Sequence, residues 1–150
     1  MKRIAIKTKI GWVTAFEENN KIFQIKFGKT KKQSSTKVLK NFKKNLLKYF
    51  KKETNYIITN YELVGNSTQK KIWNEMKKIK KGKTKSYGEL AKKFNLSPRH
   101  VGKICGQNKL PLIIPCHRVI RSDGSLGGFS ATGGIKLKKK ILQFEKKNPY

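Results

Sequence analysis

Lysine is so frequent in this chain that it limits how the chain can fold. The sequence has 37 basic residues, 4 arginines and 33 lysines, against 8 acidic ones, and its formal net charge is +29. This excess excludes an acidic solvating tail. It does not make the chain disordered, because hydrophobic residues reach 36% and recur in short runs along the whole length. The 150 residues suffice for one ordinary domain or two small ones. The charge predicts a polyanionic partner, although a biased codon supply explains the same composition equally well.

The first sixty residues predict a small α/β scaffold without chemical features. Apolar and polar residues alternate over 22–27, as is typical of a half-buried strand, and the run 11–16 is similar. The polar residues 17–20 between them predict a hairpin. Apolar side chains at helical spacing over 38–50 predict a helix with a lysine-rich solvent face, and 56–59 is a candidate strand.

The second half predicts a mainly helical domain. The composition changes near 60–65, which indicates a linker, and we expect the two domains to cover residues 1–62 and 63–150. Beyond the linker, an apolar stripe predicts a helix that begins near Asn66 and stops at Gly82.

Two short helices with a tight break between them follow. Ser86 and Glu89 have the pattern of a capping box at the start of the first, and Ser97 followed by Pro98 is typical of the start of the second. The second helix ends at Gly106. The pair predicts a helix-turn-helix, although any corner between two helices gives the same pattern.

A thiol and an imidazole stand next to each other at the end of an apolar run. The run 110–114 is followed by Pro115, Cys116 and His117. A thiolate is a nucleophile, and a nearby basic group favours it by lowering the thiol pKa. Neighbouring side chains of a regular strand point to opposite faces, so His117 needs a turn or a bridging water to take the thiol proton. Glu145, on the last predicted helix, is the candidate to orient the imidazole.

The same residues also have plain structural interpretations. A cysteine beside a histidine is more often a buried thiol with an incidental neighbour, and a residue such as Glu145 is more often exposed on its helix. Cys105 is most simply a core residue, and His100 a solvent or phosphate contact. From the residues alone, a nucleophilic thiol near a DNA-binding helix pair and a cysteine hydrolase both stay open.

The cysteine count and the length of the apolar runs bear on location. Two cysteines make no disulfide framework, and the spacing of Cys105 and Cys116 matches no zinc pattern. The longest apolar stretch, 110–116, is far shorter than the roughly 20 residues of a membrane-spanning helix. We therefore expect a protein of the cytoplasm, or of the nucleus in a eukaryotic cell, with no metal, no cofactor and no membrane partner.

The segment Pro115–Val119, PCHRV, resembles the O6-alkylguanine-DNA alkyltransferases, also called methylated-DNA–protein-cysteine methyltransferases. The resemblance implies an α+β protein with a small N-terminal RNase H-like α/β domain. A mainly helical C-terminal DNA-binding and alkyltransferase domain with a helix-turn-helix would follow. The first 60 residues match only in this general character. The other matching segments are Gly65–Gln69 with Trp73, Gly82–Leu90, Arg99, Asn108, Gly127–Ser130, Leu142 and Glu145.

The resemblance implies a reaction at Cys116. This residue would accept the alkyl group from O6 of an alkylated guanine by in-line displacement, irreversibly and once per molecule. His117, acting through a water molecule, would deprotonate the thiol, and Glu145 would orient His117. Asn108 would tie the helix-turn-helix to the active-site segment. Activity on O4-alkylthymine and the range of alkyl groups accepted stay open.

The resemblance also implies how DNA is bound. A monomer would approach double-stranded DNA carrying O6-alkylguanine through the minor groove and flip out the alkylated nucleotide. Arg99 would enter the space left in the base stack, and Tyr87 would help to turn the nucleotide out and contact its base or phosphate. Ser130 would hydrogen-bond near O6, while backbone groups of Cys116 and Val119 would read the guanine edge. The same set includes Gly102, Arg118 and Ser86.

The chain departs from the family in two places, and three rival functions stand beside the main one. Phe129 stands where many relatives have tyrosine, and the segment 129–134 is longer than the shorter family form. Residues 1–99 contain no Cys or His, so the zinc site of some relatives has no counterpart. The rivals are a non-catalytic lesion binder, which would lack Cys116, a helix-turn-helix regulator in which PCHRV is structural, and a cysteine hydrolase with repeated turnover.

Overall fold

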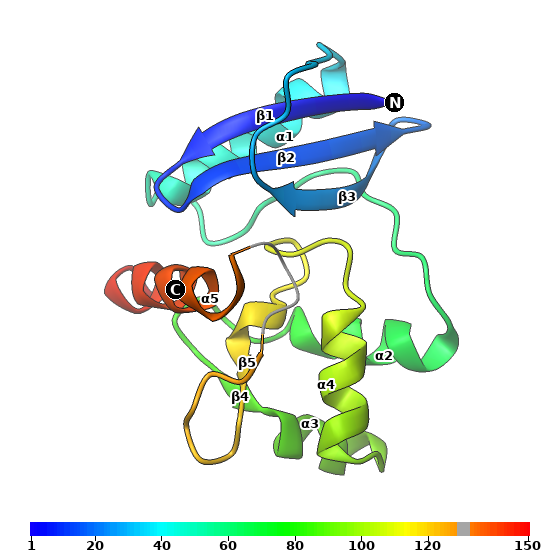
Figure 1. Cartoon of the computed structure of the whole chain (residues 1–150), viewed down its shortest axis with the longest axis vertical. Helices are drawn as coiled ribbons and strands as arrows, with labels where there is room; N and C mark the ends of the chain where they lie inside the picture. Colours follow the sequence, from blue (N-terminus) through cyan, green and yellow to red (C-terminus); the bar gives the residue numbers. More distant parts are fainter. Residues whose placement is uncertain (129–132) are drawn as a thin grey trace. The chain divides into compact units, whose positions relative to one another are not determined.

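The computed structural model describes residues 1–128 and 133–150, which form two compact units, Met1–Val64 and Gly65–Tyr150 (Figure 1). Each unit combines helices with a small sheet, so the expected α+β class is confirmed at this level. In the described part of the chain, no helix has both the length and the apolar character needed to cross a bilayer.

The first unit is a three-stranded antiparallel sheet with a helix packed on one face (Figure 1). A sharp turn at Asn19 and Asn20, with φ of 50° and 62°, joins the second and third strands. Two left-handed residues in a two-residue loop match the twist of the flanking strands, so the predicted hairpin is confirmed. The elements are β1 Lys2–Thr8, β2 Gly11–Glu18, β3 Lys21–Phe27 and α1 Lys37–Phe50.

Helix α1 forms as its apolar spacing predicts. The hydroxyl of Thr36 caps it by accepting a hydrogen bond from the Leu39 amide at 3.2 Å and contacts the carboxylate of Glu17. Leu39, Phe42 and Leu46 lie on one face and are fully buried. The lysines of the helix are left on the solvent side, as expected for an amphipathic helix.

The candidate strand at 56–59 is wrong. Tyr56 and Ile58 are exposed, so the apolar side of that alternation has no core to cover. The chain instead meets the sheet edge slightly later, where the Ile22 amide donates to the Asn60 carbonyl at 2.8 Å and the Glu62 amide donates to the Ile22 carbonyl at 2.9 Å.

The second unit gathers four helices around two very short parallel strands (Figure 1). The indole N–H of Trp73 donates to the Ile104 carbonyl at 3.0 Å and ties the first of these helices to the third. Gly65 lies flat against the same indole, where a Cβ atom would come within 2.6 Å of the ring. The elements are α2 Ser67–Met76, β4 Lys85–Ser86, α3 Tyr87–Phe94, α4 Pro98–Gly106, the 3₁₀ helix η1 Cys116–Arg118, β5 Val119–Ile120 and α5 Gly134–Lys147.

Helix α2 is shorter than predicted. Its N-terminus is a full capping box between Asn66 and Gln69, with both hydrogen bonds at 2.8 Å. It ends at Met76 rather than at Gly82, because the next turns are tighter, and the Ile79 amide donates to the Met76 carbonyl at 3.0 Å. Ile79 is still buried. Its place in the apolar stripe therefore reflects burial in a turn, not a longer helix.

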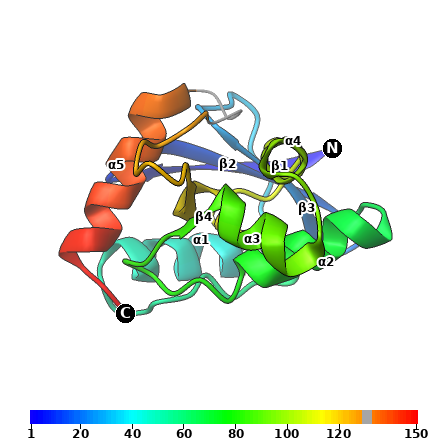
Figure 2. The same cartoon turned by 90° about the horizontal axis from the view of Figure 1, so that it is seen from below.

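Helices α3 and α4 are joined by a tight break and cross at a steep angle (Figure 2). Asn95 ends α3 in the left-handed conformation, with φ of 55°, and the Leu96 amide donates back to the Ala91 carbonyl at 2.9 Å. Ser97 then caps α4 by accepting from the His100 amide at 3.1 Å, with Pro98 at the first helical position. Both predicted helices are therefore confirmed.

Candidate active site

The segment before the cysteine is wound tightly and is held by Asn108. The Asn108 side chain accepts from the Leu110 amide at 2.9 Å and donates to the Ile114 carbonyl at 2.9 Å. Leu112 between them has a φ of 74°, a left-handed conformation that costs a non-glycine residue energy. Asn108 thus lies between the end of α4 and the cysteine, and its two hydrogen bonds hold the strained loop in place.

A 3₁₀ turn after Pro115 arranges the three residues of the motif. The Arg118 amide donates to the Pro115 carbonyl at 3.0 Å, and Cys116, His117 and Arg118 are all buried. This is the turn that the sequence required, since an extended strand would have separated the thiol and the imidazole on opposite faces.

His117, Arg118 and Glu145 form a buried cluster. The His117 Nε2 atom lies 2.9 Å from Glu145 Oε1. Arg118 donates from Nε to Oε1 at 2.9 Å and from Nη2 to Oε2 at 2.7 Å, and its Nη1 reaches the Ile79 carbonyl at 2.7 Å. Burial alone would raise the pKa of Glu145, but its interactions with His117 and Arg118 lower it well below its ordinary value. Glu145 is therefore a buried anion with two partners and not an exposed helix acid.

The second nitrogen of His117 is left open. Its Nδ1 atom is buried and has no hydrogen-bond partner among the described residues. Burial lowers the pKa of His117 below its ordinary 6.5, even though Glu145 acts in the opposite direction. A neutral imidazole whose Nε2–H donates to Glu145 has its lone pair on Nδ1. That atom is suited to accept a proton.

Cys116 is protonated at neutral pH. Its side chain is 7% exposed, and burial raises the pKa of its thiol, although a hydrogen bond from the Asn108 side chain and the charge of Lys138 oppose this. A thiol in this state needs a base before it can act as a nucleophile. His117 follows Cys116 directly in the sequence, and its Nδ1 atom has no hydrogen-bond partner among the described residues, so it is the candidate base.

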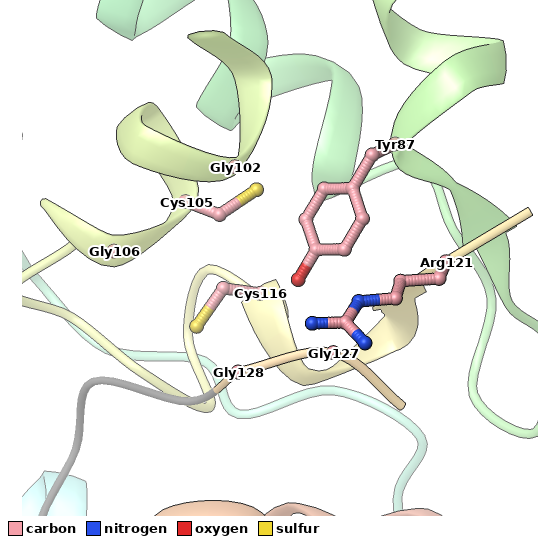
Figure 3. A pocket seen from close by; sticks show the side chains of 8 residues that line it. All are labelled: Tyr87, Gly102, Cys105, Gly106, Cys116, Arg121, Gly127 and Gly128. Carbon is pink, nitrogen blue, oxygen red and sulfur yellow. The ribbon is translucent and has the colours of Figure 1, made fainter. Parts of the chain in front are cut away.

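A pocket of about 480 Å³ opens beside Cys116, within the size range of small-molecule sites (Figure 3). Tyr87 projects into it from the first turn of α3, and burial together with the two cysteines raises the pKa of Tyr87 to about 12. Gly127, with φ of +73°, lets the loop pass this ring, since a Cβ there would lie 3.1 Å from it. The lining residues are Tyr87, Gly102, Cys105, Gly106, Cys116, Arg121, Gly127 and Gly128.

Lys138 is a buried cation that the sequence analysis missed. It is fully buried, and its Nζ atom donates to the carbonyls of Val119 at 2.7 Å, Leu126 at 2.5 Å and Gly128 at 3.3 Å. The same atom lies 3.4 Å from the Tyr87 hydroxyl and 5.6 Å from the ring centroid. Lys138 therefore holds the loop before residue 129 against the motif. Lys138 precedes Glu145 by seven residues, which places both on the same face of the last helix and was the available signal. In a chain with 33 lysines, this one was not distinguished from the others.

Arg99 lies on helix α4, and Ser86 is the residue directly before helix α3. Arg99 and His100 are exposed on the first turn of α4, while Gly102 on the next turn lines the pocket. The hydroxyl of Ser86 accepts from the Glu89 amide at 3.0 Å and so caps α3. The structure therefore brings Tyr87, Gly102, Asn108 and Cys116 together, with Arg99 outside the pocket.

Val119 and Cys105 also affect which groups a ligand in the pocket can contact. The Val119 carbonyl already accepts from Lys138, and the Val119 amide donates to the Cys116 carbonyl, so their backbone groups have only part of their capacity left. Cys105 faces the pocket as well as the core, which the interpretation as plain core packing did not anticipate. The expectations for Phe129, Ser130 and the length of the segment 129–134 concern residues 129–132. These four residues lie outside the described part of the chain.

No three side chains of His, Cys, Asp and Glu gather as a metal site anywhere in the two described ranges. The second unit thus contains a buried thiol and a hydrogen-bonded His117–Glu145 pair. It also contains a small pocket that residues of α3 and α4 line together with Cys116.

Comparisons with known proteins identify the family. A family model for the DNA-binding domain of 6-O-methylguanine DNA methyltransferase matches residues 67–147. The methylated-DNA–protein-cysteine methyltransferase of Methanocaldococcus vulcanius is 54% identical over 88 residues, 59% of this chain and 53% of that protein. A probable methylated-DNA–protein-cysteine methyltransferase of Acanthamoeba polyphaga mimivirus is 35% identical over 153 residues, 99% of each chain. The chain thus spans about half the length of the first relative and nearly all of the second.

Solved structures agree with this assignment. The crystal structure of Mycobacterium tuberculosis OGT in complex with DNA has a TM-score of 0.86 and 27% identity, covering 99% of this chain and 94% of that one. An O6-methylguanine DNA methyltransferase from Methanococcus jannaschii has a TM-score of 0.68 and 32% identity, covering 95% and 93%. The chain belongs to the 6-O-methylguanine DNA methyltransferase family, and the resemblance seen in the PCHRV motif is confirmed.

Proposed function

We propose that this protein repairs DNA by moving the alkyl group of O6-alkylguanine irreversibly onto Cys116, once per molecule. The observation that carries the proposal is the buried Nδ1 atom of His117, which has no hydrogen-bond partner among the described residues while Nε2 is engaged by Glu145 at 2.9 Å, in the residue that directly follows the buried Cys116. The M. vulcanius and mimivirus relatives are named for the same reaction. Activity on O4-alkylthymine would be a side reaction of the same site.

The reaction follows from the charges of the site. His117 Nδ1 takes the thiol proton through a water molecule, and the Cys116 sulfur attacks the alkyl carbon as the bond from that carbon to O6 breaks. The guanine product takes up one proton. Tyr87 is the facing donor, because its raised pKa keeps the hydroxyl protonated at neutral pH. The thioether that forms resists hydrolysis, so the site is used once.

DNA binding is the second part of the proposal. We assign α3 and α4 as a helix-turn-helix that approaches the minor groove, since α4 presents Arg99 on an exposed first turn and Gly102 leaves space behind it. Arg99 fills the stack while the alkylated nucleotide turns out toward Tyr87 and the pocket. An alkylated guanine pairs poorly, so extruding it costs less than extruding a normal base. The excess of lysine raises the encounter rate and makes binding depend steeply on salt.

The remaining assignments concern the whole chain. We propose that residues 1–62 are a reduced RNase H-like domain that serves as a scaffold, and that residues 63–150 bind DNA and carry the reaction. The protein acts as a monomer. Its two cysteines are free thiols, which suits a reducing compartment such as the cytoplasm, or the nucleus of a eukaryote.

The test is a single-turnover reaction with duplex DNA that carries one O6-methylguanine. Peptide mass spectrometry should find one methyl group on Cys116, none on Cys105, and an equal loss of the lesion. Cys116→Ser should leave the lesion intact, and Cys105→Ser should still repair it. An intact lesion with unmodified Cys116 in the wild type would refute the proposal. Repeated turnover of an ester or amide would favour a hydrolase, and sequence-selective binding that survives Cys116→Ser without repair would favour a regulator.

A further inference from the structure

Arg121 brings a positive charge to the edge of the pocket. Its side chain lines the pocket and is exposed, and Figure 3 shows the guanidinium directed toward the Tyr87 hydroxyl and Cys116. The other lining residues of the described chain are uncharged at neutral pH, namely glycines, cysteines and a tyrosine. Lys138, the nearby buried cation, is already engaged by backbone carbonyls. Arg121 is thus the lining cation that a ligand in the pocket can reach.

The charge of Arg121 is not neutralised by an ion pair within the described residues. Asp123, two residues further on, is instead engaged by Ser125, whose amide and hydroxyl donate to its carboxylate at 2.9 Å and 2.7 Å. The charge of Arg121 contributes to the lowered pKa of Asp123, after the hydrogen bonds from Ser125, but the two side chains form no ion pair. An exposed guanidinium that no carboxylate holds in an ion pair, next to neutral pocket walls, is suited to bind an oxyanion, which it can contact through two parallel N–H donors.

The backbone holds Arg121 in this place. Its amide donates to the Ser125 carbonyl at 2.9 Å, and its carbonyl accepts from the Gly124 amide at 3.0 Å. On the pocket side, a Cβ atom on Gly127 would lie 3.6 Å from Arg121 Cγ and 3.1 Å from the Tyr87 ring, so the three residues are packed together. The stem of the side chain therefore starts from a fixed turn at the pocket edge.

We propose that Arg121 is a specificity-determining residue that binds an oxyanion of the nucleotide entering the pocket. This inference rests on the proposed function. The oxyanion has two possible sources, a backbone phosphate flanking the extruded nucleotide or a carboxylate carried by the O6 substituent, as in O6-carboxymethylguanine. A phosphate contact would help every alkylated guanine in DNA. A carboxylate contact would favour acidic adducts over neutral ones.

The experiment measures single-turnover rates of alkyl transfer to Cys116 with three substrates. These are free O6-benzylguanine, which has neither oxyanion, duplex DNA with O6-methylguanine, which has only phosphates, and duplex DNA with O6-carboxymethylguanine, which has both. The variants are Arg121→Gln and Arg121→Lys. The matched control is Lys71→Gln, which removes one positive charge from an exposed position of α2 outside the pocket lining. The control accounts for the general loss of charge, since Lys71→Gln and Arg121→Gln each remove one of the 37 basic residues.

Lys71→Gln should react with free O6-benzylguanine at the wild-type rate, and the Arg121 variants should lose less rate with this substrate than with a duplex whose oxyanion Arg121 binds. If the oxyanion is a phosphate, Arg121→Gln should react about tenfold more slowly than Lys71→Gln with both duplexes, the loss expected for one charge-assisted hydrogen bond. If it is the carboxylate, only the carboxymethyl duplex should show that loss. Arg121→Lys, which keeps the charge, should recover part of the rate.

Other results would overturn the inference. Equal rates of Arg121→Gln and Lys71→Gln on both duplexes would show that Arg121 binds no oxyanion. An equal loss with free O6-benzylguanine would show that Arg121 only shapes the pocket. In both cases transfer to Cys116 still occurs and the proposed function stands. A wild-type protein that transfers nothing from any of the three substrates would refute the proposed function itself, and this inference with it.

Discussion

Arg118 and Glu145 form a two-pronged ion pair, with Nε to Oε1 at 2.9 Å and Nη2 to Oε2 at 2.7 Å, and the same Oε1 atom contacts His117. Because Arg118 already neutralises the carboxylate, Glu145 can orient the imidazole without forcing a proton onto it. One buried anion thus serves two neighbours, and His117 stays a neutral base.

Replacing Glu145 by glutamine should destabilise the second unit. The substitution leaves the buried Arg118 charge without a counter-ion, and breaking such a pair costs about 3–5 kcal/mol. The free energy of unfolding from urea titrations measures the loss. Glu89→Gln, at an exposed position of α3, is the control and should stay within about 0.5 kcal/mol of the wild type. Equal stability of the two variants would mean that Arg118 does not depend on Glu145.

The free energy of unfolding should decrease in two steps as the pH is lowered. The folded state holds the pKa of His117 below the ordinary 6.5, so the unfolded chain binds more protons as the pH drops below 6.5, and the folded state loses stability. The folded pKa of Glu145 is below the ordinary 4.5, so its contribution is present above pH 4.5 and is lost as the pH falls below it.

Urea titrations between pH 8 and pH 4 test the first step. The slope attributable to His117 is at most about 1.4 kcal/mol per pH unit, the value for one proton. His117→Asn should flatten the profile just below pH 6.5 and make the step below pH 4.5 smaller without removing it, because Arg118 still lowers the pKa of Glu145. A variant profile parallel to that of the wild type over the whole range would contradict the buried neutral imidazole.

Lys138→Met should loosen the pocket wall. The Nζ atom serves the carbonyls of Val119 and Leu126 at 2.7 Å and 2.5 Å, and a methionine leaves both without that donor. We expect a loss of about 3 kcal/mol in the free energy of unfolding, since unsatisfied buried acceptors cost about 1–3 kcal/mol each. The rate with free O6-benzylguanine should fall as well. Lys139→Met, exposed on the same helix, should change neither quantity, and a similar loss there would point to helix α5 as a whole.

Arg99→Ala should separate DNA repair from the chemistry. Arg99 is exposed and outside the pocket lining, so the variant should react with free O6-benzylguanine at the wild-type rate. Repair of O6-methylguanine in a duplex should slow by far more, because the proposed mechanism then has no side chain to fill the stack behind the flipped nucleotide. Lys103→Ala, also exposed on α4, controls for the lost charge. Equal losses with both substrates would argue against the role in the stack.

Local signals in the sequence predicted the elements around the site well. Ser97 and Pro98 marked the start of α4 to the residue, because capping chemistry depends only on near neighbours. The left-handed Leu112 had no such signal, since its conformation is held by the Asn108 side chain, which accepts from the Leu110 amide and donates to the Ile114 carbonyl. The end of α2 was missed for a related reason, as Ile79 is buried by tertiary contacts beyond the helix.

Some residues of the site could likewise be predicted from the sequence, and others could not. The contact between His117 and Glu145 joins residues 28 positions apart. The place of Glu145 on the last predicted helix made it a candidate for this contact, and the family resemblance implied the same role. Lys138 escaped because burial of a lysine is decided by three carbonyls from other segments, which no local pattern reports. Arg121 is one of only four arginines, but it had no predicted role, because its place at the pocket edge depends on the turn that Ser125 closes.

The hydrogen bond from the Trp73 indole to the Ile104 carbonyl makes this tryptophan a fluorescent reporter of the second unit. The chain has two tryptophans, Trp12 in the first unit and Trp73 in the second, so each unit contains its own fluorophore. In a Trp12→Phe background, the remaining emission reports the attachment of α4 to α2 without any added dye. Unfolding of the second unit can therefore be followed by intrinsic fluorescence alone.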